Sequence, residues 1–281
     1  MPLTEQEHKE LRKFAKKIRK DIVDVTQWSG GAHIGGSLSM VDFMVVLYWK
    51  YLRIDPKNPH WEERDRLVLS KGHGGVGHAV ILANRGYFDF EVLKDFNQFG
   101  CAYGMHLDSR KAIGVEASTG SMGHGLSQAL GMALGARVLK KEWKVYAVVG
   151  DGECNEGSIW EAAMAAKHYK TGNLIAFLDR NHMMIDGPTE SVMSLEPLDK
   201  KWEAFGWYTQ LIDGHDMPKI CEAIDKALAY NDGPSMIICD TVKGKGVDFM
   251  EGNPAWHYGG LSAELAEKAK ISIDKMYPDI P

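Results

Sequence analysis

The chain has 281 residues, 44% of them hydrophobic, and a formal net charge of −5. This length is enough for one large domain with a sizeable core, and we expect a single domain over residues 1–281. The mild acidity gives no general attraction to nucleic acid or to anionic membranes, so we expect neither as a partner.

Apolar periodicity predicts helices alternating with strands. A capping box, Thr4-x-x-Glu7, opens the first helix, and Ser39-x-x-Asp42 predicts a second helix through Tyr51. The further elements, in chain order, are a strand at 66–70, a helix at 75–84, a helix at 126–139, a strand at 144–149, a helix at 156–169, a strand at 173–178, a strand at 207–212, a helix at 216–229, a strand at 236–242 and a helix at 262–276. This alternation predicts an α/β fold, a doubly wound parallel sheet with helices on both faces.

The cysteines, the amino terminus and the longest apolar run bear on location. Cys101, Cys154, Cys221 and Cys239 are too widely spaced for metal-ligand pairs. The amino terminus is a charged helical pattern rather than a signal peptide. The longest apolar run, residues 40–49, is much shorter than the roughly 20 residues that cross a bilayer. We therefore expect a soluble protein of the reducing cytoplasm.

Glycine gathers in four segments between the predicted elements, at residues 30–36, 72–77, 120–125 and 150–157. These segments contain histidine, aspartate or glutamate or lie beside them, unlike flexible linkers, so we interpret them as loops of a functional site.

A carboxylate and a carboxamide follow two neighbouring strands. Asp151, flanked by glycines, follows the strand at 144–149, and Asn181 follows the strand at 173–178. Ligands of open α/β sheets bind beyond the carboxyl ends of the strands, and glycine lets the backbone approach closely. Two such oxygens and a carbonyl from the turn after Asn181 suit Mg²⁺ or Ca²⁺, with phosphate oxygens and water at the other positions. The pattern predicts a metal-bridged diphosphate.

Four of the 11 histidines, His33, His73, His106 and His257, lie in loops of this kind rather than on helix faces. One such histidine alone is more often a structural residue than a catalytic one. Four of them in site-like loops favour a functional role.

Six stretches form an ordered set: SGGAHIGGSLS, LSKGHGG, VEASTGSMGHGLSQALGMA, the segment from GDG at 150–152 to Asn181, IDG at 185–187, and KGKGVDF followed by WHYGG. In this order they resemble the amino-terminal, diphosphate-binding part of a transketolase over nearly the full chain. The GDG-to-Asn segment resembles the thiamine-diphosphate motif. The resemblance therefore implies this cofactor and the thiamine-diphosphate-binding fold of the PP domain.

The resemblance also implies roles for single residues. Asp151, Asn181 and the carbonyl of Met183 match ligands of Mg²⁺, for which Ca²⁺ or Mn²⁺ can substitute. His33, His73 and His257 match catalytic positions, and His33, His106 and His257 match positions that face sugar hydroxyls. The positions matched to cofactor binding are His73, Gly120, Ser121, Met122, Gly123, Gly150, Asp151, Gly152, Glu153, Glu156, Asn181 and His257.

The matched chemistry accounts for these residue types. Imidazole titrates near neutrality and suits proton transfer to and from a sugar hydroxyl, while the cofactor supplies the electron sink. Glu156 matches a glutamate at the contact between two active sites of the family.

Four basic residues are candidate contacts for a phosphate of the substrate or cofactor: Arg64, Lys71, Lys243 and Lys245.

Two motifs depart from the family pattern. The usual histidine-proline-glycine is replaced by the sequence around His33, which is closer to deoxyxylulose-phosphate synthases, and the usual glycine-histidine-proline by the sequence around His106. In addition, His124 stands where the family often has glutamine. The cofactor is therefore better specified than the sugar.

A full transketolase carries two further domains, one of which presents the glutamate that activates the cofactor. This chain ends at Pro281, and none of its glutamates matches that residue. We expect a whole amino-terminal subunit of a split transketolase. It would work with a carboxy-terminal, pyrimidine-binding partner chain in an α2β2 heterotetramer, moving a two-carbon ketol unit from a ketose phosphate to an aldose phosphate of the pentose phosphate pathway.

Three alternatives stay open. The α subunit of a thiamine-dependent 2-oxoacid dehydrogenase shares the GDG-to-Asn motif, although it has less use for sugar-facing imidazoles. A module that binds metal and diphosphate without catalysis would need the same loops. A transketolase acting on an unusual branched or sulfonated sugar would retain every motif above.

Overall fold

Five apolar segments pair as parallel strands in the computed structural model, which describes residues 3–280. The order across the sheet is β1-β2-β3-β5-β4, and every neighbouring pair is parallel. The strands are β1 (Arg66–Leu69), β2 (Val145–Gly150), β3 (Leu174–Arg180), β4 (Tyr208–Asp213) and β5 (Ser235–Asp240). Each overlaps a predicted strand. The predicted domain of residues 1–281 reaches beyond the described residues at both ends and stays a prediction.

Helices occupy most of the remaining chain. The α-helices are α1 (Glu5–Trp28), α2 (Ile34–Ser39), α3 (Val41–Val46), α4 (Gly75–Arg85), α5 (His124–Val138), α6 (Gly157–His168), α7 (Thr189–Val192), α8 (Leu198–Ala204), α9 (Met217–Ala229) and α10 (Ala263–Met276). Short helical turns of other types are η1 (Leu47–Tyr51), η2 (Gly72–Gly74), η3 (Phe90–Asp95), η4 (Gly152–Asn155) and η5 (Pro254–Trp256).

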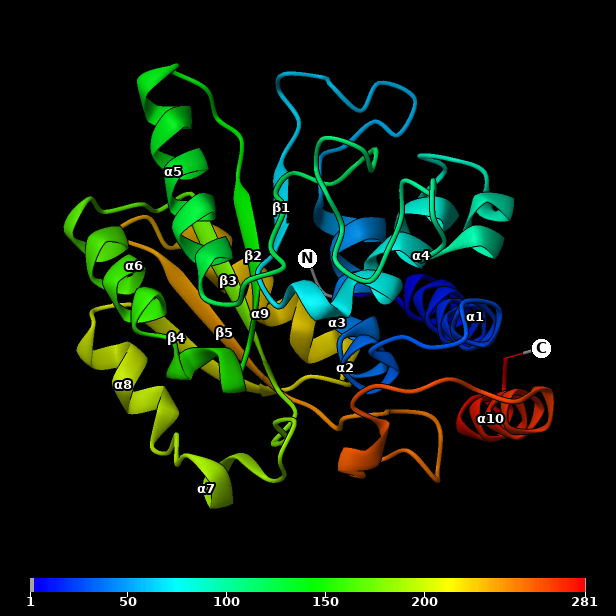
Figure 1. Cartoon of the computed structure of the whole chain (residues 1–281). Coiled ribbons are helices and arrows are strands. Elements are labelled where there is room, and N and C mark those ends of the chain that lie inside the picture. Colours follow the sequence, from blue (N-terminus) through cyan, green and yellow to red (C-terminus); the bar gives the residue numbers. More distant parts are fainter. Residues whose placement is uncertain (1–2, 281) are drawn as a thin grey trace.

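Side chains of the central strands alternate between two apolar layers. In β2, Tyr146 and Val148 pack into the layer that also contains α1 to α4 and α9. Val145, Ala147 and Val149 pack into the layer that contains α5, α6 and α8. Figure 1 shows these two groups of helices on opposite sides of the sheet. The predicted parallel α/β sheet with helices on both faces is confirmed, and a strand buried on both faces explains why β2 and β3 are apolar almost throughout.

The capping box predicted at Thr4 and Glu7 is present at the start of α1. The Thr4 side chain accepts from the backbone N–H of Glu7 at 3.2 Å, and the Glu7 carboxylate accepts from the backbone N–H of Thr4 at 2.9 Å. The sequence analysis did not select Asp216 and Ser262 as caps, but their side chains accept from the backbone N–H groups of Lys219 and Leu265 at the starts of α9 and α10. These bonds satisfy N–H groups that the first helical turn leaves without partners.

The predicted helix from Ser39 to Tyr51 was wrong at its amino end. Helix α2 begins five residues earlier, inside a glycine-rich segment that we interpreted as a loop, and α3 follows as a separate helix. Ser39 does not cap a helix because its hydroxyl donates to the buried carboxylate of Asp179 at 2.6 Å. Asp42 instead accepts from Arg19 at 2.7 Å inside the core. Both polar residues bind tertiary partners that local sequence does not reveal.

Two observations concern the location predicted from the sequence. No helix within residues 3–280 is long and apolar enough to cross a membrane. The four cysteines carry free thiols.

Two glycines of α5 provide a test of how this helix packs. A Cβ on Gly125 would lie 2.5 Å from Cα of Ser70, whereas a Cβ on Gly131 would meet nothing within 4 Å. We expect Gly125→Ala to destabilise the chain by about 1–3 kcal/mol through overpacking against the end of β1. Gly131→Ala, the matched control, should stabilise it by about 0.5–1 kcal/mol through helix propensity. Urea unfolding measures both, and equal effects of the same sign would contradict this packing.

Candidate active site

A cleft of about 250 Å³ opens beyond the carboxyl ends of β2 and β3. Parallel strands present their carboxyl ends at one edge, which is where such folds bind ligands. Of the residues predicted for the site, the cleft is lined by His33, His73, His106, Gly120, Met122, Gly150, Asp151, Gly152, Glu153, Asn181, Met183 and His257. Ser121, Gly123 and Glu156 do not line it. Sequence reasoning did not select Met184, Ile185 and Asp186 as single site residues, although the last two begin the IDG motif.

A buried carboxylate, Asp179, anchors the floor of this cleft. It accepts hydrogen bonds from the ammonium of Lys71, from the hydroxyls of Ser39 and Thr241 (2.6 and 2.5 Å) and from the amide of Asn181 (3.1 Å). Burial opposes ionisation of this group, but the charge of Lys71 and these hydrogen bonds lower the pKa of Asp179. Asp179 is therefore a structural anion, and no periodic pattern in the sequence marks it.

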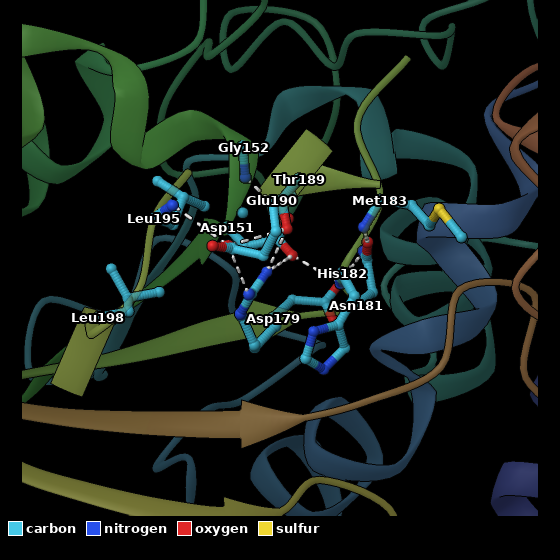
Figure 2. Close-up of polar contacts among 12 residues, drawn as sticks. Asp151, Gly152, Asp179, Asn181, His182, Met183, Thr189, Glu190, Leu195 and Leu198 are labelled. Atoms are coloured by element: carbon cyan, nitrogen blue, oxygen red, sulfur yellow. Dashed lines mark hydrogen bonds and ion pairs between the residues drawn. The ribbon is translucent and has the colours of Figure 1, made fainter. Parts of the chain in front are cut away.

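The three predicted metal ligands lie together at the ends of β2 and β3. Asp151 and Asn181 are buried, and both side chains accept hydrogen bonds from backbone N–H groups of the turn that follows β3. Asp151 Oδ2 accepts from the N–H of His182 at 2.7 Å, and Asn181 Oδ1 accepts from the N–H of Met183 at 3.2 Å. Figure 2 shows these residues around the turn that follows β3. The amide of Asn181 donates to Asp179, so its oxygen is the atom left to serve as a ligand.

This donor set fits a hard divalent cation. It offers a carboxylate, a carboxamide oxygen and the main-chain carbonyl of Met183, all of which Mg²⁺ accepts. Asp151 Oδ1 accepts one hydrogen bond, from Gly152 at 2.7 Å, while Oδ2 accepts from His182 and Arg180. Because a carboxylate has about four lone-pair positions, one remains for a metal. Burial and the charge of Asp179 raise the pKa of Asp151, a shift that a bound cation would oppose.

The four predicted histidines converge on one another, with His33 at the centre. Its ring centroid lies 5.5 Å from His73, 5.8 Å from His106 and 5.3 Å from His257. A fifth ring, Tyr258, lies 5.1 Å from it. Nδ1 of His33 is buried without a hydrogen-bond partner among residues 3–280. Buried polar atoms normally have a partner, so this atom is suited to a polar ligand or a water.

Burial and positive charge keep three imidazoles of the cleft, those of His33, His73 and His257, neutral. Burial, then His106 and the two lysines Lys243 and Lys71, lower the pKa of His33 to about 4. Burial and Lys243 lower the pKa of His257 to about 3, and burial and Lys71 lower that of His73 well below its usual value. At neutral pH each of these rings is a proton acceptor rather than a proton donor.

Lys243 connects the histidines to the predicted metal ligands. Its ammonium donates to His257 Nδ1 at 2.7 Å and to the carbonyl of Met183 at 3.3 Å. Burial and the nearby charge of Lys71 lower the pKa of Lys243 to about 8. Two buried lysines therefore face the cleft, as a diphosphate site requires. The other two candidate phosphate contacts, Arg64 and Lys245, do not line the cleft, and they pair with Glu116 and Glu251.

Two predicted cofactor residues hold loops together. Glu153 Oε1 accepts from the hydroxyl of Ser70 at 2.6 Å and from the N–H of Gly123 at 2.8 Å, and Oε2 accepts from Gly150 at 2.9 Å. Gly123 has a φ of 86°, which favours glycine, and a Cβ there would lie 2.7 Å from Cβ of Glu156. These contacts fix two of the glycine-rich loops, at residues 120–125 and 150–157, relative to each other and to the end of β1.

Residues 11–276 match the family model of the transketolase thiamine diphosphate binding domain. The chain belongs to the transketolase family. It is 44% identical to the 6-deoxy-6-sulfo-D-fructose transketolase subunit SqwG of a Clostridium species, over 95% of this chain and 97% of that protein. It is 41% identical to an apulose-4-phosphate transketolase subunit of Phocaeicola vulgatus, over 93% and 92% of the two chains.

Solved transketolases share the fold. The transketolase of Pichia stipitis in complex with sedoheptulose-7-phosphate superposes with a TM-score of 0.90 and 30% identity, over 94% of this chain and 41% of that one. The transketolase of Campylobacter jejuni gives 0.88 and 31%, over 94% and 42%. The chain thus spans about two fifths of these full-length enzymes. The predictions of a transketolase-family chain and of a thiamine-diphosphate-binding fold are confirmed.

The lowered histidine pKa values make the stability of this transketolase domain depend on pH. The unfolded chain binds protons at His33 and His257 near pH 6.5, but the folded chain binds them only near pH 4 or below, so stability falls as the pH drops through this window. We expect the double variant His33→Asn, His257→Asn to lose less melting temperature than the wild type between about pH 7 and 5. Thermal unfolding by circular dichroism measures this, with His60→Asn, an exposed histidine outside the cleft, as control. Identical slopes in all three proteins would contradict these pKa shifts.

Proposed function

We propose that this chain is the thiamine-diphosphate-binding subunit of a transketolase made of two kinds of chain. The proposal rests on one observation. A single cleft of a transketolase-family domain brings together three oxygen ligands suited to a metal, four histidines and two buried lysines. With a partner chain, it would transfer a two-carbon ketol unit from a ketose phosphate or a related sugar to an aldose phosphate.

The proposed division of the cleft follows from its chemistry. Asp151, Asn181 and the carbonyl of Met183 would hold Mg²⁺, which would supply positive charge to the cofactor's diphosphate, and the charges of Lys71 and Lys243 face the same cleft. When bound, the cofactor supplies an electron sink for the carbon fragment left by the donor sugar.

The histidines handle protons of the sugar. His33, His106 and His257 bind hydroxyl groups, and the neutral rings of His33 and His257 accept a proton from a hydroxyl as the donor is cleaved. His73, half-buried and in ring contact with both His33 and His257, holds these rings in place beside the cofactor. With an anion bound beside the two lysines, the pKa values of the histidines would rise toward 7, where proton transfer in both directions is efficient.

The partner supplies the rest of the site. Two relatives are named as subunits, and the solved full-length enzymes are more than twice as long as this chain. We propose a pyrimidine-binding partner chain that brings the glutamate needed to activate the cofactor, in an α2β2 heterotetramer. The four free thiols are compatible with assembly in the cytoplasm.

The sugar is proposed from the relatives. One acts on 6-deoxy-6-sulfo-D-fructose and another on apulose 4-phosphate, as their names state. These names favour a sulfonated or branched sugar over a pentose phosphate of central metabolism as the substrate of this chain.

The first test is reconstitution. This chain is mixed with a co-encoded carboxy-terminal chain, thiamine diphosphate and Mg²⁺, and two-carbon transfer to an aldose phosphate is measured from 6-deoxy-6-sulfofructose, apulose 4-phosphate and xylulose 5-phosphate. We expect turnover only in the mixture, with the preferred donor identifying the sugar. Turnover of pyruvate with none of the three sugars would favour the 2-oxoacid dehydrogenase alternative, and full activity of this chain alone would overturn the need for a partner.

The second test addresses the metal. Asp151→Asn removes the one charged ligand of the proposed set, and we expect Mg²⁺-dependent affinity for thiamine diphosphate to fall by about 100-fold, since even residues behind metal ligands contribute 10–100-fold. Isothermal titration calorimetry measures it. Asp213→Asn, the same change at the exposed end of β4, is the control and should bind as the wild type does. Unchanged binding by Asp151→Asn would show that the metal is held elsewhere.

A further inference from the structure

Arg180, the last residue of β3, is a buried cation that contacts the predicted metal ligand Asp151. Its side chain is 4% exposed, and all three guanidinium nitrogens donate hydrogen bonds. Nη1 donates to Asp151 Oδ2 at 3.1 Å and to the hydroxyl of Thr189 at 2.7 Å. Nη2 donates to Glu190 at 3.0 Å and, with Nε, to Glu196 at 2.9 and 3.1 Å. One side chain thus connects the end of β2 with the segment of α7 and the residues before α8.

The inner contacts close a ring. Asp151 Oδ2, which accepts from Arg180, also accepts from the N–H of His182 at 2.7 Å. The carbonyl of His182 accepts from the N–H of Thr189 at 3.0 Å. The hydroxyl oxygen of Thr189 accepts from Arg180, which closes the ring. Figure 2 shows Asp151, His182 and Thr189 gathered around this ring.

The ring pins both ends of a short hairpin. The hairpin comprises residues 183–188, and His182 and Thr189 flank it. An antiparallel bridge between Met183 and Pro188 and a hydrogen bond from Met184 N–H to Gly187 O at 2.8 Å close it. This hairpin carries the carbonyl proposed as a metal ligand and four residues that line the cleft, Met183, Met184, Ile185 and Asp186. Ile185 is 65% exposed, so side-chain packing alone holds the tip weakly.

We propose that Arg180 is a positioning residue that couples the metal ligand Asp151 to this hairpin, so that the carboxylate and the Met183 carbonyl are held at one spacing before metal and cofactor arrive. The inference rests on the metal site of the proposed function. The guanidinium fork suits this task because it donates in two fixed directions, to the carboxylate and to the hydroxyl, whereas an ammonium is a point charge. Preorganised ligands bind more tightly because less ordering remains to be done on binding.

The outer contacts differ in kind from the inner ones. The side chains of Glu190 and Glu196 are 41% and 51% exposed, so water can replace Arg180 as their partner. Asp151 is buried and lacks that option. The proposal therefore assigns the function to the inner ring and only support of the α7 segment to the outer pairs.

The test uses the full chain with Mg²⁺ and thiamine diphosphate. We expect Arg180→Met to weaken Mg²⁺-dependent cofactor affinity by about 10–100-fold, the usual range for residues behind metal ligands. Amide hydrogen exchange at residues 182–189 should become faster, raised Mg²⁺ should restore binding, and turnover at saturating cofactor with the partner present should stay near that of the wild type. Arg180→Lys should recover only part of the affinity.

Two further variants separate the inner ring from the outer pairs. Thr189→Val breaks the ring at its other end and should share the faster exchange and weaker binding. Glu196→Gln removes one charge of an outer acid and should leave cofactor affinity and exchange at 182–189 unchanged. A merely structural role of Arg180 would lower the melting temperature without changing cofactor affinity per folded molecule, and that result would overturn the inference.

The comparison with Asp151→Asn distinguishes two failures. If Asp151→Asn abolishes cofactor binding and both Arg180→Met and Thr189→Val bind as the wild type does, the positioning role is wrong and the metal site stands. If Asp151→Asn also binds normally, the proposed metal site is wrong, and the positioning role falls with it. If Arg180→Met does not fold, exchange and binding in Thr189→Val decide the inference by the same criteria.

Discussion

The buried charge of Asp179 is the constraint on which the rest of the site depends. A carboxylate removed from water costs several kcal/mol unless ionic and hydrogen-bonded partners surround it. Here those partners come from different parts of the fold: Lys71 follows β1, Ser39 ends α2 and Thr241 follows β5. Hydrophobic packing alone would tolerate small shifts among these elements, but this network is satisfied in only one arrangement. The polar network therefore fixes the edge of the sheet at which the cleft opens.

A second buried carboxylate extends the same logic to the loops. Glu153 accepts hydrogen bonds from Ser70, Gly123 and Gly150, which lie in separate segments of the chain. The apolar layers set how helices lie on the sheet, and the two carboxylates set how the glycine-rich loops meet above it. Glycine is needed where these loops touch, because a Cβ on Gly125 or Gly123 would collide with a neighbouring segment.

The sequence predicted the parallel sheet, both of its covered faces and the edge that holds the cleft, because these follow from local periodicity and from where polar residues interrupt it. It also selected the four histidines that converge. It did not predict the start of α2 or the roles of Asp179 and Arg180. An arginine at the end of a strand has the pattern of a solvated surface residue, and only the approach of the α7 segment makes it a buried one. Features that depend on contacts between distant segments leave no local periodicity.

The electrostatics of the cleft connect cofactor binding to the state of its histidines. The positive charges of Lys71 and Lys243 oppose protonation of the groups near them. Together with burial, this repulsion lowers the pKa of Lys243 to about 8 and that of His33 to about 4. A cleft with this repulsion binds an anion well, since the anion removes a cost that the free chain bears. The same anion would raise the pKa values of the imidazoles toward 7, where the rings can both accept and donate a proton. Under the proposed function, the chain without its cofactor holds the histidines in a form that cannot complete the proton transfers, and binding of the diphosphate prepares them.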